Sequence, residues 1–179
     1  MIDYTIRAEE PADRAGTREL LTAAFPTAEE AVLVDALREN RGVWQPGASY
    51  VAVDSTQRVL AHSLLTRCWI DSWPALALAP CAVLPEYQRA GIGTAVTKAA
   101  LEDVQKLSQT TNSPLAVVVL GHAEYYPRFG FEPARYFGIK APFDVPHEAF
   151  MVLNLNPEFE IPSGTVHYPS EFGIAEDDD

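Results

Sequence analysis

The distribution of hydrophobic and polar residues along this chain predicts an alternation of strands and helices. Short apolar or alternating runs rich in β-branched residues predict strands at residues 4–8, 49–54, 59–70, 76–84 and 115–120. Apolar residues that recur every three or four positions predict helices at residues 13–25, 28–40 and 94–107. The order is then β-α-α-β-β-β-α-β, followed by a short helix that ends at Gly130, a residue suited to the left-handed position after a helix. This order predicts a fold of the α/β (α+β) class.

The same patterns predict which helix faces are buried and how the chain closes. We expect the core-facing residues to be Val32, Leu33, Ala36 and Leu37 in one helix and Ile92, Val96, Ala100, Val104 and Leu107 in the other. After Gly130, strands are expected at residues 131–139 and 149–155, with a further edge strand at 165–168. Residues 1–172 are predicted to form a single domain, and the acidic run 173–179 is expected to be disordered because it has nothing to bury.

The segment from Cys81 to Thr94 carries the strongest chemical signal. It is an apolar run that breaks at Pro85 and resumes as a helix that opens on Gly91 and Gly93. A helix leaves the N–H groups of its first turn without an acceptor inside the helix, and its dipole favours negative charge there. Glycine lets a phosphate approach the backbone closely and lets the loop adopt positive φ. The segment therefore predicts a phosphate-binding loop.

The spacing of the glycines narrows the kind of phosphate ligand. The loop lacks the Gly-Lys-Ser/Thr ending of a Walker A loop and the third glycine of a dinucleotide fingerprint. The pattern Gln-x-x-Gly-x-Gly from Gln88 to Gly93 resembles the acetyl-CoA loop of the GNAT superfamily of N-acetyltransferases. Downstream, the strand at 115–120 precedes Tyr-Tyr-x-x-Phe-Gly-Phe at 125–131, in the order and at the separation usual in that superfamily. The segments 146–151 and 164–169 further resemble a bacterial subgroup known only as acetyltransferases, so the resemblance covers about residues 7–172.

The resemblance implies a fold and a cosubstrate. The GNAT fold is a mixed, mostly antiparallel sheet that is splayed between its fourth and fifth strands and has helices on both faces. The cosubstrate is acetyl-CoA, whose pantetheine pairs with the free edge of the fourth strand while the loop holds the pyrophosphate; no metal is involved. An ordinary buried strand is the alternative reading of the fourth strand. The expected cofactor-binding residues are Cys81, Ala82 and Val83 in that strand, and Gln88, Arg89, Ala90, Gly91, Ile92, Gly93 and Thr94 in the loop and helix start.

The resemblance also implies candidates for the proton transfers. Tyr126 stands four residues before Gly130, where the superfamily commonly has a tyrosine beside the thioester sulfur. Because a phenol has a pKa of about 10, matched to a thiolate of similar basicity, we expect Tyr126 to be the general acid. Tyr125 is expected to pack and is the alternative acid. His122 follows the fifth predicted strand and is the candidate base, because histidine exchanges protons near neutral pH; a purely structural role stays open.

Other residues receive weaker assignments. Glu86 is expected to be a solvated turn residue, whereas Glu30 and Glu148 are left unplaced relative to the acceptor pocket. A covalent role for Cys81 is disfavoured, because no neighbouring residue in the sequence would activate its thiol. The three tryptophans are expected to line the core or a pocket.

Composition limits the partners. With 47% hydrophobic residues, the chain is globular, and its formal net charge of −12 disfavours nucleic acid and anionic membranes. A cationic amine is the better match. Two cysteines and four histidines show no metal-ligand spacing. The start lacks a signal-peptide pattern and no apolar run is long enough to span a membrane, which predicts a cytoplasmic location.

The sequence as a whole predicts that an acetyl group passes from acetyl-CoA to a primary amine of a small molecule or peptide by direct attack in a ternary complex. Two other readings stay open, a non-catalytic acyl-CoA-binding module and an acyltransferase that uses a longer acyl-CoA. The sequence also leaves open a homodimer and the identity of the acceptor.

Overall fold

The computed structural model describes residues 1–174 of the 179-residue chain. It divides into two compact units, the first formed by Met1–Leu65 with Ala79–Val104 and the second by Thr66–Leu78 with the chain from Gln105 onward. Most of the acidic run predicted to be disordered, residues 175–179, lies outside the described residues. No helix within residues 1–174 combines the length and the apolar character needed to cross a membrane.

Within the described residues, nine strands form a mixed sheet, which confirms the predicted fold class. The strands are β1 (Thr5–Ala8), β2 (Trp44–Val53), β3 (Val59–Ile70), β4 (Trp73–Val83), β5 (Ala116–Leu120), β6 (Glu132–Pro133), β7 (Ile139–Lys140), β8 (Phe150–Asn154) and β9 (Gly164–His167). The main order is β1-β2-β3-β4-β5-β8-β6, and β9 pairs with β3 and β7. Strands β4 and β5 are parallel, through Leu76 opposite Val117 and Ala77 opposite Val118. Strand β4 then runs on to Val83.

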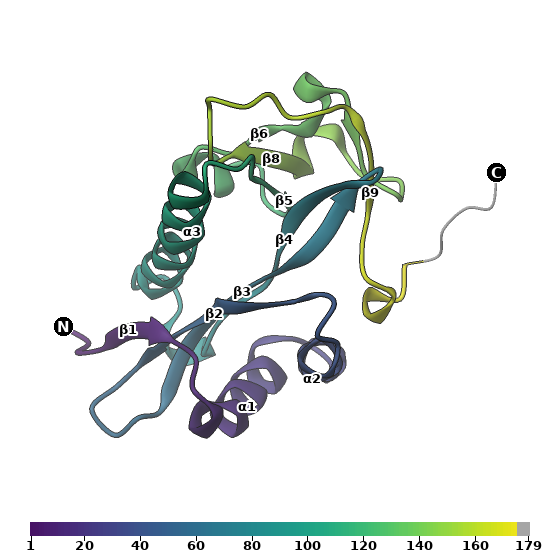
Figure 1. Cartoon of the computed structure of the whole chain (residues 1–179). Helices are drawn as coiled ribbons and strands as arrows, with labels where there is room; N and C mark the ends of the chain where they lie inside the picture. Colours follow the sequence, from purple (N-terminus) through teal and green to yellow (C-terminus); the bar gives the residue numbers. More distant parts are fainter. Residues whose placement is uncertain (175–179) are drawn as a thin grey trace. The chain divides into compact units, whose positions relative to one another are not determined.

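In the first unit, helices cover both faces of the strands (Figure 1). These are α1 (Arg14–Ala24) and α2 (Glu29–Glu39) on one face and the first part of α3 (Ile92–Thr111) on the other. Successive side chains of a strand point to opposite faces of the sheet, and two neighbouring residues of β3, His62 and Ser63, show this. The ring of His62 bonds Ser49 of β2, whereas the hydroxyl of Ser63 bonds Thr97 of α3 at 2.7 Å.

Two predicted helix faces are partly wrong. Val32 of α2 is 55% exposed, and the buried residues of this helix are Ala31, Val34 and Leu37. Leu107 of α3 is 50% exposed, and Ser108 is buried in its place. The hydroxyl of Ser108 donates to the carbonyl of Ser113 at 2.6 Å, so the polar residue is satisfied inside. The hydrophobic pattern therefore correctly predicted that Leu37 of α2 and Val96 of α3 are buried but wrongly predicted the same for Val32 and Leu107.

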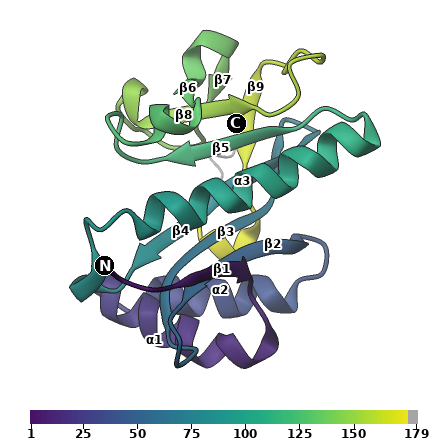
Figure 2. The ribbon, with the colours of Figure 1, turned by 90° about the vertical axis from the view of Figure 1, so that its left-hand side faces the viewer.

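In the second unit, β5 and β8 lie side by side, with Val118 opposite Val152 (Figure 2). The predicted strand at 131–139 is wrong. The chain forms only the two-residue β6, which pairs with β8, and then a 3-10 turn at Ala134–Phe137. The next strand, β7, pairs with β9 and not with β8. Pro133 has no N–H for a ladder, and Gly138 has φ 68°, so the local chemistry interrupts the strand. The predicted strands at 149–155 and 165–168 are confirmed by β8 and β9. The predicted edge position of the second strand is wrong, because β9 pairs with both β3 and β7.

Candidate active site

A curved loop joins the end of β4 to the start of α3. It passes through a 3-10 turn at Pro85–Tyr87 and then through Arg89 and Gly91, whose φ angles are 64° and 83°. The first helical hydrogen bond runs from the N–H of Ala95 to the carbonyl of Gly91 at 3.1 Å. Gly91 is therefore the N-cap of α3, and Ile92, Gly93 and Thr94 form its first turn. The loop thus presents the positive end of a 20-residue helix, which is the geometry that binds a phosphate group.

The surroundings of Gly91 leave room for a ligand. A Cβ built at this position would meet no atom within 4 Å, so the backbone faces open space. A side chain here is unfavourable because of the left-handed φ angle and not because of a clash within the protein. Arg89 holds a similar left-handed angle without being glycine, at a cost of about 1 kcal/mol. The loop therefore keeps an unusual backbone path around the helix start.

Neighbouring residues hold the loop in place. The side-chain amide of Gln88 donates to the carbonyl of Val83 at 3.2 Å, which links the loop to the last residue of β4. Arg58 donates to Glu86 at 2.7 Å, and its guanidinium lies 5.9 Å from the ring centre of Tyr87. Glu86 is exposed and lies in the 3-10 turn, as predicted. The contact between Gln88 and Val83 therefore gives a structural role to two of the predicted cofactor-binding residues.

Tyr126 lies against the backbone at the end of β5. A Cβ on Gly121, the residue after β5, would lie 2.9 Å from Cδ2 of Tyr126 and closer still to Cε2. Only a glycine leaves room for the ring at this position. The ring also makes edge contacts with Tyr125 and Phe131, at centroid distances of 5.0 and 5.8 Å. Gly121 was not among the residues predicted to matter from the sequence, and the contact with Tyr126 gives it a structural role.

Tyr125 occupies a different environment. The guanidinium of Arg128 lies 4.1 Å from its ring centre, and the Nε of Arg128 donates to the carbonyl of Tyr125 at 2.8 Å. Its ring also packs edge-on against Phe129. This arrangement agrees with the expectation that Tyr125 packs. The turn ends at Gly130, whose φ of 97° confirms the predicted left-handed position.

His122 is near Tyr126 in the chain, and its backbone holds the tyrosine pair. Its carbonyl accepts the N–H groups of Tyr125 at 3.0 Å and of Tyr126 at 3.4 Å, while its side chain is exposed. The two predicted catalytic residues therefore both lie in the second unit, on the turn that follows β5. The ten predicted cofactor-binding residues lie in the first unit.

Comparison with known proteins adds a family to this geometry. The model of the acetyltransferase (GNAT) family matches residues 15–131, about two thirds of the chain. The chain belongs to the GNAT acetyltransferase family. Among curated relatives of this family, the uncharacterized N-acetyltransferase YjhQ of Escherichia coli K12 is 37% identical over 150 residues, which are 81% of this chain and 79% of YjhQ.

Two solved GNAT structures resemble the whole chain. The N-acetyltransferase YhbS from Escherichia coli, in complex with CoA, has a TM-score of 0.86 and 27% identity, with 97% of this chain and 93% of YhbS covered. A GNAT acetyltransferase from Brucella melitensis, in complex with acetyl-CoA, has a TM-score of 0.74 and 28% identity, with 96% and 99% covered. The predicted GNAT fold is therefore confirmed.

The structure also contains a buried polar cluster that the sequence prediction missed. The carboxylate of Glu9 accepts hydrogen bonds from Arg38, from Ser49 at 2.7 Å and from Thr17 at 2.8 Å. The hydroxyl of Ser49 also lies 2.9 Å from Nε2 of His62. Burial lowers the pKa of His62 to about 4, although the charge of Glu9 opposes this shift. His62 is therefore neutral at pH 7 and packs inside the protein as an uncharged residue.

The signal for this cluster was weak in the sequence. None of Glu9, Arg38 and His62 was predicted from the sequence to be a functional residue. The side chains of Arg38 and Glu9 are only 7% and 4% exposed. A buried charged residue is rare without a partner, but the partner's position in the sequence is decided only by the fold.

The remaining assignments concern acidic residues and a possible metal. Glu30 lies in the first turn of α2 and is half-buried, and its Oε2 has no hydrogen-bond partner among the described residues. Glu148 is exposed in a 3-10 turn before β8. Within residues 1–174, no group of three or more His, Cys, Asp and Glu side chains is arranged to hold a metal ion.

Proposed function

We propose that this chain transfers the acetyl group of acetyl-CoA to a primary amine of a small molecule or peptide. The observation that carries the proposal is the loop at the start of α3, with open space in front of Gly91. The CoA and acetyl-CoA bound to YhbS and to the Brucella melitensis enzyme support the choice of cosubstrate. In the proposal, the pyrophosphate accepts hydrogen bonds from the N–H groups of residues 91–94.

The pantetheine arm is proposed to pair with the backbone of Cys81, Ala82 and Val83. An added strand needs an N–H or C=O that points outward at alternate residues. The carbonyl of Val83 already accepts a bond from Gln88, but a carbonyl oxygen has a second lone pair. An N–H group at the same strand end is proposed to face the thioester carbonyl and to stabilise the negative charge that develops on its oxygen.

In the proposed reaction, the amine of the acceptor directly displaces the thiol of CoA from the acetyl group. The neutral amine attacks the thioester carbon, an N–C bond forms, and the C–S bond then breaks. The thiolate that leaves takes a proton from Tyr126, which regains one from water, while the nitrogen loses its proton to His122 directly or through water. Direct attack requires both substrates to be bound at the same time.

Thiol release in the presence of a panel of primary amines, amino acids and short peptides tests the proposal. Acetyl-CoA should bind in calorimetry, and mass spectrometry should show that at least one amine gains the mass of an acetyl group less one hydrogen. No binding at millimolar acetyl-CoA would contradict the cofactor site. Binding without acetylation of any amine would favour a non-catalytic acyl-CoA-binding module, and faster turnover of a longer acyl-CoA would favour a different donor.

Three further assignments belong to this proposal. Residues 1–172 act as a single domain, the location is cytoplasmic, and nucleic acid is not a partner. Whether the chain forms a homodimer is left open. The net charge of −12 supports the exclusion of nucleic acid, because a negative surface gains nothing from a polyphosphate. Salt-sensitive binding of DNA in a gel-shift assay would contradict this assignment.

A further inference from the structure

The second unit contains a small cavity beside β8. The 3-10 turn at Ala134–Phe137, strand β7 and the loop that follows it enclose a space of about 280 Å³ next to Phe150, the first residue of β8. An apolar protein cavity of about 150 Å³ holds one benzene molecule. The cavity therefore has room for one aromatic ring and part of a chain attached to it.

Most of the lining is apolar and includes two aromatic rings. The apolar lining residues are Ala134, Ile139, Ala141, Phe143, Val145 and Phe150. Phe143 meets the ring of Phe150 edge-on at a centroid distance of 6.5 Å and stacks on Tyr168 at 6.0 Å, so these contacts hold the aromatic wall in place. Such a wall favours an aromatic ring, because aromatic rings pack edge-on or offset against one another.

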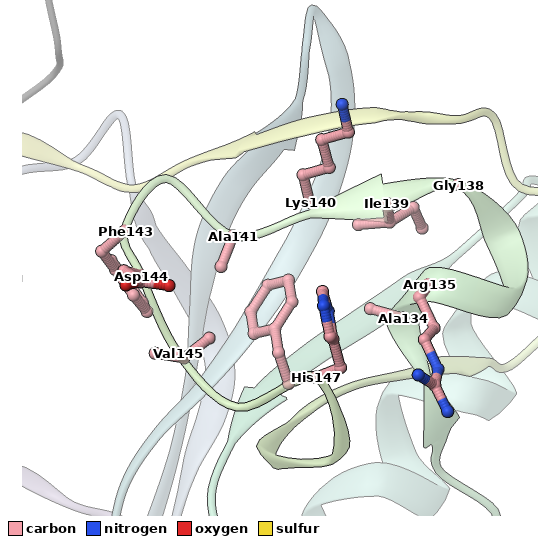
Figure 3. Close-up of a pocket in the computed structure, with 11 residues that line it drawn as sticks. Ala134, Arg135, Gly138, Ile139, Lys140, Ala141, Phe143, Asp144, Val145 and His147 are labelled. Atoms are coloured by element: carbon pink, nitrogen blue, oxygen red, sulfur yellow. The ribbon is translucent and has the colours of Figure 1, made fainter.

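The charged side chains of the lining do not point into the cavity. In Figure 3, the side chains of Arg135 and Lys140 extend away from it, and the guanidinium of Arg135 lies 5.6 Å from the ring centre of Tyr136. Asp144 is exposed, so its carboxylate is hydrated. The imidazole of His147 projects into the cavity. The interior therefore suits the uncharged part of a ligand, and a charged group of that ligand would stay outside.

The wall of the cavity is connected to the turn that carries Tyr126. Phe150 lies directly opposite Leu120, the last residue of β5, so the two side chains point to the same face of the sheet. Leu120 is 46% exposed, an apolar surface next to the wall of the cavity. The N–H of Gly121 then donates to the carbonyl of Ala149 at 2.9 Å, and the ring of Tyr126 lies against Gly121. Phe150 and Leu120 therefore lead from the cavity to the strand end beside Tyr126.

We propose that the acceptor is a primary amine with one aromatic ring on a short alkyl chain, and that this cavity binds the ring. This inference rests on the proposed acetyl transfer. The ring packs against Phe150 and the chain passes over Leu120. Residues opposite each other in two antiparallel strands are about 5 Å apart, a distance that a chain of about two carbons between ring and nitrogen covers. The amine then lies outside the cavity, beside the turn that carries Tyr126.

Phenethylamine and ethylamine, which differ only by the ring, test this proposal. Each is titrated into the full chain in the presence of CoA, which has no acetyl group to transfer, and the backbone amide signals are followed by NMR. Phenethylamine should shift the signals of Leu120, Ala141 and Phe150 and should bind at least tenfold more tightly than ethylamine, because the ring leaves water. No shift at these residues at millimolar phenethylamine, or equal binding of the two amines, overturns the proposal.

A kinetic test uses the ratio of kcat/KM for phenethylamine to that for ethylamine, measured by thiol release from acetyl-CoA. The ratio should be at least tenfold in the natural protein. In Figure 3, the methyl group of Ala141 points into the cavity, and Ala141 is half-buried, so Ala141→Phe fills the space without replacing a core residue. This variant should lower the ratio at least tenfold. Ala99→Phe, the same change at a half-buried alanine of α3, should leave the ratio unchanged. Equal ratios in the two variants contradict the assigned cavity.

Failure of this inference is distinguishable from failure of the proposed acetyl transfer. Equal kcat/KM for the two amines leaves the acetyl transfer standing and excludes the cavity as the acceptor site. Shifts at the cavity without acetylation of any amine contradict the acetyl transfer, and with it the role of the ring-bearing amine as an acceptor. In that case the NMR result still assigns the cavity as a site that binds an aromatic ring.

Discussion

The substitution Gly121→Ala tests whether the position of Tyr126 matters for turnover. The new Cβ would lie 2.9 Å from Cδ2 of the ring and closer to Cε2, whereas carbon atoms in contact are about 3.5–4.0 Å apart. The ring must therefore retreat by about 1 Å, because the new Cβ is fixed to the backbone that follows β5 and all three of its nearest atoms belong to the Tyr126 ring. A misplacement of about 1 Å at a catalytic group can cost about 10²-fold in rate.

The assay is thiol release with acetyl-CoA and the best acceptor from the amine panel. We expect kcat of Gly121→Ala to fall by about 10²-fold, while the KM for acetyl-CoA changes by less than about threefold, because the loop proposed to bind the cosubstrate is untouched. The N–H of Gly121 bonds the carbonyl of Ala149 at 2.9 Å, and alanine keeps this bond. A crystal structure of the variant should show the Tyr126 ring displaced from its contact with Phe131.

Two controls make the reasoning refutable. Gly16→Ala places a Cβ 2.9 Å from Cγ2 of Val59, a similar clash in the first unit, and should lower stability but retain turnover. In a double-mutant cycle, Gly121→Ala should cost little more in the Tyr126→Phe background if Tyr126 is the proton donor, as proposed, because both changes then impair the same group. Equal losses in the two backgrounds, or near-wild-type activity of Gly121→Ala, would refute the link between this glycine and the tyrosine.

Three further predictions concern the loop, the tyrosine pair and the buried histidine. Tyr126→Phe should lower kcat by about 10²-fold with the KM for acetyl-CoA nearly unchanged, and Tyr125→Phe should matter less; the reverse order in thiol-release kinetics would exchange their roles. Gly91→Val should weaken acetyl-CoA binding at least tenfold in calorimetry, because valine disfavours a φ of 83° and fills the open space in front of the loop; unchanged binding would remove the loop from the cofactor site. The folded-state pKa of His62 is lowered from 6.5 to about 4, so its contribution to stability is complete above pH 6.5 and is lost as the pH falls toward 4. Between pH 7.5 and pH 5 this amounts to about 2 kcal/mol at 1.36 kcal/mol per pKa unit, and urea unfolding of His62→Gln should lack this loss; the same pH dependence in both proteins would contradict the assignment.

The sequence by itself determined the features that depend on a short stretch of chain. The bounds of β3, Val59–Ile70, follow from a continuous run of strand-forming residues between two turns and agree with the structure. Gly91 and Gly130 have the left-handed angles that their positions at helix ends predicted. These strand bounds and glycine conformations could be predicted from the sequence, because the steric limits on φ and ψ depend only on a few neighbouring residues.

The tertiary structure decided which distant residues meet. The contact between Glu9 and Arg38 joins the end of β1 to α2, and Ser49 and His62 reach it from β2 and β3. The pairing of these strands, which sets the face to which each side chain points, depends on register, and a shift by one residue would reverse every face. The burial of a helix face depends in the same way on the elements packed against it, which explains why the pattern misassigned Val32 of α2. Local propensity acts along the chain, whereas burial and pairing depend on the neighbours that the complete fold supplies.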